Sequence, residues 1–178
     1  MTVAKALSSA YLPISATLMS QKIYDVLRDG GDKYGMFGTG YTYGGHPASA
    51  AVALETLKIY EERDIVDHVR EVSPTFLAEL EACRDHPLVG DVRGVGLIAG
   101  AELMADKASK TPFPPERKAG PIVEKACLEN GLIVRAIGDR IAFTPPLIIS
   151  DKEIVELFRR FRIGLDTAYE RMTASQAA

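Results

Sequence analysis

Three residues of this chain combine a reactive or ion-binding side chain with a suitable local sequence: Lys5, Thr42 and Arg135. Lys5 follows a short apolar run and precedes a turn of small residues, and a lysine held in this way can use its neutral amine as a nucleophile. Thr42 lies in a glycine-rich loop before a helix, where backbone N–H groups and the helix dipole suit a phosphate. Arg135 can grip a carboxylate with two parallel hydrogen bonds, even in a desolvated pocket.

Each of these residues also has a plainer interpretation. Lysines are mostly exposed, so Lys5 can be an ordinary solvated side chain. The Gly40–Pro47 segment can be a turn with a capping residue, because glycine is common wherever the chain turns tightly. Arg135 and the nearby Arg140 can be exposed arginines on a half-solvated sheet. The local sequence alone leaves these alternatives open.

The first part of the chain predicts few regular elements. An apolar run at 14–19 is typical of a strand, and a helix is predicted over 21–27, ending at Gly30-Gly31. Residues 30–46 are rich in glycine and are predicted to be loop. A helix follows from Pro47, a residue suited to a first helical turn.

The second part alternates helices and strands. The apolar spacing over 64–83 predicts a core-facing helix, interrupted by Pro74. We expect a small antiparallel sheet covered by helices on one side, which makes this half α+β and the whole chain α/β. Residues 92–103 are expected to form a strand pair or a bent long strand with glycines at the bends. The other elements expected are a helix over 121–129, a hairpin of 132–136 with 140–144, and a last helix opened by a Ser150–Glu153 capping box.

Composition excludes several classes of protein. The 178 residues are 47% hydrophobic and 25% charged, with a net charge of −3, as in an ordinary globular protein. No basic stripe indicates nucleic-acid binding, and no apolar run is long enough to span a membrane. Neither the three scattered histidines nor Cys83 and Cys127 form a metal-binding pattern. Without a recognisable signal peptide, we expect a cytoplasmic location.

Three segments carry a family resemblance. Ala-Lys-Ala-Leu-Ser-Ser-Ala-Tyr-Leu-Pro-Ile-Ser around Lys5, Gly-Tyr-Thr-Tyr-Gly-Gly-His-Pro around Thr42 and Gly-Leu-Ile-Val-Arg-Ala-Ile-Gly-Asp around Arg135 resemble the class III aminotransferases that depend on pyridoxal 5'-phosphate (PLP). The resemblance is to the omega-amino acid or amine:pyruvate type and runs from Thr2 to about Met172. It implies fold type I ancestry and transfer of an amino group from an amine or omega-amino acid to a 2-oxo acid such as pyruvate.

The resemblance also implies a role for each residue. Lys5 would form the Schiff base with PLP and shuttle a proton. Thr42 would bind the PLP phosphate of the neighbouring subunit, which implies a homodimer with shared active sites. Arg135 would clamp the substrate carboxylate, whereas Arg140 does not match that position.

In the resembled family the lysine lies well past the middle of a longer polypeptide. The resemblance therefore implies the C-terminal portion of such an enzyme, beginning at an internal methionine just before the Schiff-base lysine. Residues 1–62 would be the remnant of the PLP-binding large domain, and residues 63–178 the small domain. The family's acidic partner of the pyridine nitrogen, its stacking aromatic ring and its Gly-Ser phosphate cup all lie upstream of the lysine.

Two alternatives to transamination stay open. One keeps the cofactor but changes the reaction, giving an aminomutase or decarboxylase of the same family. The other is a catalytically inactive fragment that serves only as a folding or dimerisation module. The sequence therefore leaves open whether this chain is by itself an enzyme, and it does not identify the amino donor.

Overall fold

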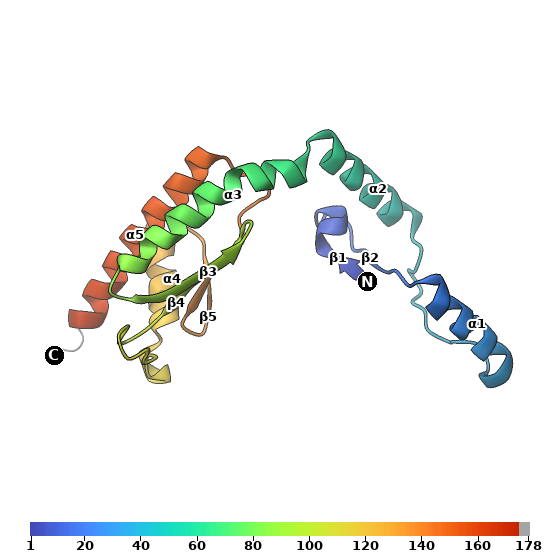
Figure 1. Cartoon of the computed structure of the whole chain (residues 1–178), viewed down its shortest axis with the longest axis horizontal. Helices are drawn as coiled ribbons and strands as arrows, with labels where there is room; N and C mark the ends of the chain where they lie inside the picture. Colours follow the sequence, from blue (N-terminus) through green and yellow to red (C-terminus); the bar gives the residue numbers. More distant parts are fainter. Residues whose placement is uncertain (175–178) are drawn as a thin grey trace. The chain divides into compact units, whose positions relative to one another are not determined.

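The structure is a computed structural model of the chain and describes residues 1–174. The chain divides into two compact units, Met1–Asp64 and Ile65–Ala178. Figure 1 shows the elements of each unit in sequence colours.

The first unit is built around a small two-stranded sheet. Strand β1 (Thr2–Ala4) pairs antiparallel with β2 (Ser15–Thr17), and a short 3-10 helix, η1 (Lys5–Ser8), lies between them in the sequence. Two longer helices follow, α1 (Gln21–Tyr34) and α2 (Pro47–Glu62) (Figure 1). The predicted strand and the helix from Pro47 are therefore present.

Helix α1 is longer than the sequence analysis predicts. It continues through Gly30 and Gly31 to Tyr34, so the expected end at these glycines is wrong. A glycine inside a helix costs only about 0.5–1 kcal/mol relative to alanine, which a longer helix can tolerate. The helix ends instead at Gly35, whose φ of 88° lies in the left-handed region that glycine adopts readily.

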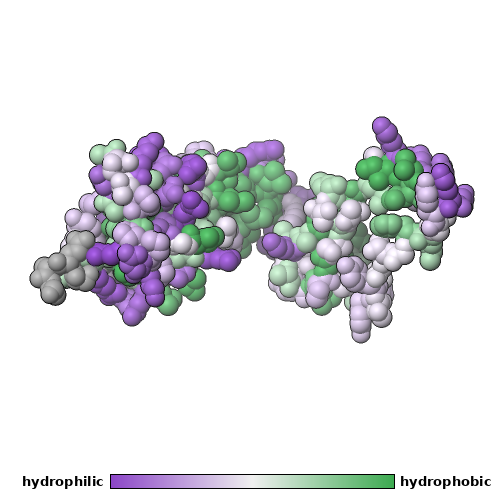
Figure 2. Space-filling model, turned by 90° about the horizontal axis from the view of Figure 1, so that it is seen from below, coloured by the Kyte–Doolittle hydropathy of each residue, from purple (hydrophilic) through white to green (hydrophobic). Residues whose placement is uncertain are grey.

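The first unit has almost no apolar core of its own. Its buried side chains are only Ser8, Ala53 and Thr56, and α1 buries none. Hydrophobic side chains are instead exposed on its surface (Figure 2), including Ile23, Val26, Phe37 and Leu54. Exposed apolar surface of this kind is typical of an interaction site.

The second unit contains a four-stranded antiparallel sheet of order β3-β4-β6-β5. Side chains alternate across it, so Val92, Ala101 and Ile141 occupy one row and face the core. Of the two arrangements expected over 92–103, the strand pair is present, and it begins earlier, at Val89. The predicted hairpin is also present, with its first strand shifted to Arg135–Ile137. The strands are β3 (Val89–Val95), β4 (Ile98–Leu103), β5 (Arg135–Ile137) and β6 (Arg140–Phe143).

Three helices cover the inward face of this sheet (Figure 1). The rings of Phe76, Phe143 and Phe158 are in contact at the centre of the core, with centroids 5.2–5.4 Å apart. The predicted sheet covered by helices on one side is therefore confirmed. The helices are α3 (Ile65–Glu81), α4 (Ala119–Glu129) and α5 (Asp151–Ala174), and two short 3-10 helices, η2 (Ala82–Asp85) and η3 (Pro115–Arg117), lie beside them in the sequence.

The capping box predicted at the start of α5 is confirmed. The Glu153 carboxylate accepts the Ser150 N–H at 2.8 Å, and the Glu153 N–H donates to Ser150 Oγ at 3.4 Å. The hydrogen bond from the Ser150 backbone, followed by that from its hydroxyl, lowers the pKa of Glu153. None of the helices in the described part of the chain combines the length and apolar content that a bilayer crossing demands.

Helices α4 and α5 approach closely where Gly164 faces Cys127. A Cβ added at Gly164 would lie 2.6 Å from Cys127 Sγ and 3.1 Å from its Cα. Cys127 is fully buried, and burial raises the pKa of its thiol to about 12, so the thiol is protonated and packs as a small apolar group.

We predict that Gly164→Ala destabilises the chain by about 1–3 kcal/mol, because the helices must separate to admit the methyl group. Urea unfolding followed by circular dichroism measures the loss. Gly30→Ala is the matched control, since it is also a helical glycine but has no atom within 4 Å of the added Cβ. Equal stability of the two variants would contradict the close approach.

His86 gives the second unit a specific dependence on pH. Its Nδ1 accepts the Leu88 N–H at 3.2 Å, and its Nε2 lies 3.4 Å from the Asp166 carboxylate. Burial lowers the pKa of His86, more than the nearby Asp166 raises it. A proton on Nδ1 would break the bond to Leu88, so the folded chain takes up this proton less readily than the unfolded chain.

Neutral His86 should stabilise the folded chain fully at pH values above the ordinary histidine pKa of about 6.5. The free energy of unfolding should decrease as the pH drops below this value. For a single proton, the free energy of unfolding changes by at most about 1.4 kcal/mol per pH unit. Urea unfolding across this range measures it, with His86→Gln as the comparison. A slope that is the same in both proteins would show that other groups cause it.

Candidate active site

Lys5 lies at the start of a strained turn. Strand β1 ends at Ala4, and the φ angles of Lys5, Ser9 and Ala10 are 54°, 46° and 61°. Residues other than glycine adopt this left-handed backbone conformation at a cost of about 1–3 kcal/mol each. They keep it only where the surrounding structure holds them. One such restraint is the buried Ser8, whose Oγ donates to Leu12 O at 2.6 Å.

Tyr60 of α2 supplies the other restraint on this turn. Its Oη donates to Ala6 O at 2.9 Å and lies 2.9 Å from Ser9 Oγ. The helix that follows the glycine-rich loop therefore also fixes the lysine turn. The sequence gives no signal for this role of Tyr60, because nothing in the local pattern links a helix residue to a turn more than fifty positions earlier.

Lys5 and the glycine-rich loop line the same hollow of the first unit. Its volume is about 660 Å³, within the range of roughly 300–1,000 Å³ that is common for small-molecule sites. Its lining in the described chain contains no acidic residue. The lining residues are Ala4, Lys5, Pro13, Ile14, Ser15, Tyr41, Tyr43, Gly44, Gly45, His46, Ser49 and Ala50.

The loop leaves the N-terminus of α2 without a side-chain cap. His46 precedes Pro47 but makes no capping hydrogen bond, and its ring stacks on Tyr43 with centroids 5.8 Å apart. Gly45 has a φ of 71°, which turns the chain into the helix. Thr42 is exposed and does not line the hollow, although both of its neighbours do.

Arg135 lies in the second unit, on the edge strand β5, with its side chain exposed. Beside it is a mostly apolar groove of about 350 Å³, which Phe143, Pro145 and Leu157 help to line. Within residues 65–174, it is the one arginine whose side chain makes neither an ion pair nor a hydrogen bond. Its guanidinium is therefore free to bind an external anion at the rim of an apolar surface.

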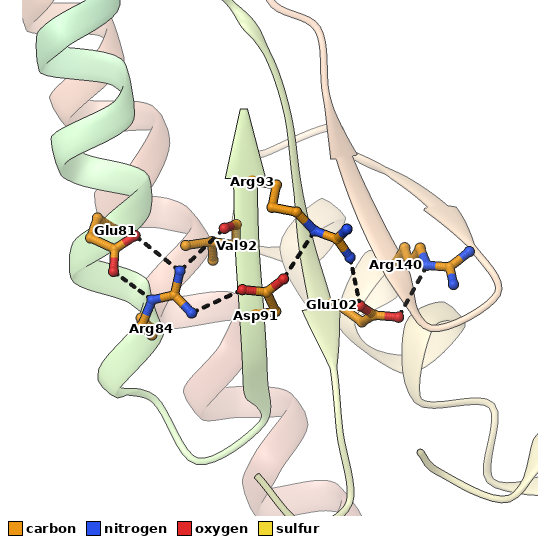
Figure 3. A network of polar contacts seen from close by, with 7 residues as sticks. All are labelled: Glu81, Arg84, Asp91, Val92, Arg93, Glu102 and Arg140. Atoms are coloured by element: carbon orange, nitrogen blue, oxygen red, sulfur yellow. Dashed lines mark hydrogen bonds and ion pairs between the residues drawn. The ribbon is translucent and has the colours of Figure 1, made fainter. Parts of the chain in front are cut away.

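The other sheet arginines are neutralised by a chain of alternating charges (Figure 3). Glu102 Oε1 lies 3.2 Å from Arg140 Nε, and its Oε2 lies 3.1 Å from Arg93 Nη2. Hydrogen bonding from Arg84 lowers the pKa of Asp91 at the centre of the chain. The members in order are Glu81, Arg84, Asp91, Arg93, Glu102 and Arg140.

The structure thus brings Lys5 and the loop around Thr42 to one hollow, and it places Arg135 in the other unit. The described residues contain no group of three or more histidine, cysteine, aspartate or glutamate side chains that could hold a metal ion. In the first unit, an amine beside a helix N-terminus without a side-chain cap suits a group with a phosphate, and in the second unit the guanidinium of Arg135 suits a carboxylate.

Residues 1–164 match the family model for aminotransferase class-III, so the chain belongs to the class III aminotransferase family. It is 42% identical over 176 residues to a probable gamma-aminobutyrate transaminase 3, mitochondrial, of Oryza sativa subsp. indica, covering 99% of this chain and 34% of that protein. It is 45% identical to the gamma aminobutyrate transaminase 3, chloroplastic, of Solanum lycopersicum, covering 96% and 33%. The chain thus spans about a third of the length of the curated relatives it matches.

Solved structures agree with this assignment. A thermostable omega transaminase 6-fold mutant from Pseudomonas jessenii superposes with a TM-score of 0.92 at 40% identity, covering 97% of this chain and 38% of that one. The PMP-bound form of an aminotransferase from Vibrio fluvialis gives a TM-score of 0.91 at 27% identity, with 96% and 38% covered. The family and the α/β fold class inferred from the sequence are therefore confirmed.

We predict that Tyr60→Phe loosens the lysine turn, because it removes the hydrogen bond to Ala6 O at a cost of about 1 kcal/mol. Amide exchange at Ser9 and Ala10, whose N–H groups bond within the turn, should then be roughly fivefold faster. Tyr24→Phe removes an exposed hydroxyl of α1 in the same unit and should change neither rate. Equal rates in the two variants would show that Tyr60 does not hold the turn.

Proposed function

We propose that this chain contributes three functional groups to a PLP-dependent aminotransferase that transfers an amino group from an amine or omega-amino acid to a 2-oxo acid such as pyruvate. The observation that carries the proposal is the hollow that Lys5, on its restrained turn, shares with the glycine-rich loop. Membership of the class III family supports the same reaction.

Lys5 would hold the cofactor through its Nζ and, once displaced by the substrate amine, carry a proton to and from the substrate carbon. PLP would supply the aldehyde for this attachment and a ring that withdraws electrons from that carbon. The uncapped amides of α2 and the hydroxyl of Thr42 suit the phosphate, with Thr42 serving the neighbouring subunit of a homodimer. The exposure of Thr42 outside the hollow is compatible with that cross-subunit role.

Arg135 would bind the carboxylate of the amino donor or of the 2-oxo acid. Arg135 has no ion-pair partner in the described part of the chain, which supports this role, since a paired arginine would first have to break an ion pair. An omega-amino acid such as 4-aminobutanoate carries such a carboxylate. The names of the plant relatives, gamma-aminobutyrate transaminases, support that substrate class.

The hollow fits PLP only in part, because the described residues that line it include no acid to protonate the pyridine nitrogen. We propose that the rest of the family fold supplies this acid. Residues 1–62 would then be part of the PLP-binding large domain and residues 63–178 the small domain. A cytoplasmic location is proposed with it, although the plant relatives are named mitochondrial and chloroplastic.

A second candidate is a folding or dimerisation module without catalysis. The exposed apolar surface of the first unit and the missing acid favour it for this chain acting alone. A third hypothesis is an aminomutase or decarboxylase. Transamination is distinguished from these reactions by its requirement for a 2-oxo acid acceptor.

The test is mass spectrometry after incubation of the purified chain with PLP and reduction with borohydride. We predict a single adduct on Lys5 that disappears in Lys5→Ala and persists in Lys22→Ala, a matched lysine on α1. Amine:pyruvate assays would then follow. Adducts spread over many lysines and unchanged by Lys5→Ala would contradict a specific cofactor site in this chain and favour the inactive module.

A further inference from the structure

Two carboxylates join helix α4 to the β5–β6 hairpin. Asp139 in the hairpin turn accepts the Gly120 N–H at 2.9 Å, and Glu124 of α4 accepts the Ala136 N–H of β5 at 3.0 Å. Gly120 and Glu124 are four residues apart, so they lie on the same face of the helix. The turn therefore caps the helix, and the helix in return satisfies an amide of the strand.

Strand β5 takes its register from the two-residue turn at Gly138 and Asp139 and from its pairing with β6, and Glu124 adds a contact from outside the sheet. It consists of three residues at the edge of the sheet and pairs only with β6. Arg135 and Ile137 are exposed, whereas Ala136 between them is half-buried. A slip of one residue would turn Arg135 to the helix-covered face, because side chains alternate between the two faces of a strand.

The contact at the turn is also restricted sterically. A Cβ added at Gly120 would lie 1.9 Å from Gly138 O, so only glycine permits this approach. This close approach fixes the hairpin turn against α4, whereas a separate contact joins strand β5 to the helix. Ala136 is next to Arg135, and its N–H donates to Glu124, a side chain outside the sheet. The Glu124 contact therefore anchors the strand from outside the sheet, at the residue beside Arg135.

We propose that Glu124 is a positioning residue for Arg135, holding β5 in the register that presents the guanidinium on the open face of the sheet. Its contribution to substrate recognition rests on the proposed function, in which Arg135 binds a carboxylate. The register itself does not depend on that function. The inference and the function can therefore be tested separately in the same protein.

The experiment compares three variants of the full chain by NMR. Glu124→Ala removes the acceptor, Glu124→Gln keeps an acceptor oxygen of nearly the same size, and Glu129→Ala is the matched control. Glu129 belongs to the same helix but pairs with Arg171 instead of the sheet. In Glu124→Ala, we expect Ala136 amide exchange about tenfold faster and weaker contacts between Arg135 and its cross-strand partner Ala142. Glu124→Gln should restore both, and Glu129→Ala should change neither.

Titration with propanoate, followed at the Arg135 Nε–H signal, connects the register to carboxylate binding. We expect a saturable shift in the wild type and in Glu124→Gln, with at least about fivefold weaker binding in Glu124→Ala. Unchanged Arg135–Ala142 contacts in Glu124→Ala would overturn the inference, even if Ala136 exchanged faster. A wild type that does not respond to propanoate would overturn the carboxylate role of Arg135, while the register result would still decide the role of Glu124.

Discussion

The need to bury one face of the four-stranded sheet organises the second unit. Val92, Ala101 and Ile141 form an inward row that packs under the helices, and this row fixes the register of three strands. Because successive side chains alternate, the same register places Asp91, Glu102 and Arg140 together on the opposite face. The ion-pair chain of Figure 3 is thus a consequence of core packing. Its exposed members add little stability themselves, since exposed ion pairs contribute about 0–1 kcal/mol.

The hydrophobic constraint is weakest at β5, the strand that carries Arg135. Burial there is limited to one half-buried side chain, so polar contacts from α4 take over the role that the core has elsewhere. The same arrangement explains why Arg135 is available. Glu102 is occupied by Arg93 and Arg140, and Glu124 contacts the edge strand through the Ala136 N–H, so neither carboxylate pairs with Arg135. The position of the Arg135 guanidinium thus depends on the contacts of β5 with α4, and its availability depends on the pairing of Glu102 with other arginines.

The two units differ in how they are stabilised. The second buries a continuous core from its sheet and all three of its long helices, whereas the first buries only three side chains. The first unit nevertheless holds the lysine turn in a strained conformation, through Tyr60 and Ser8. Strain without a large core is consistent with a segment whose remaining surface is covered by further parts of the family fold.

The sequence by itself determined the family, the α/β class, the amphipathic helices and the Ser150–Glu153 cap, because these depend on local spacing and on recognisable motifs. It misjudged the end of α1, since a tolerated glycine and a terminating glycine look alike until the φ angle is known. Only the tertiary structure decided that Tyr60 holds the lysine turn, that Glu124 contacts β5, and that Arg135 has no partner among residues 1–174. Such contacts join residues far apart in the chain, and their existence depends on how the packed elements bring them together.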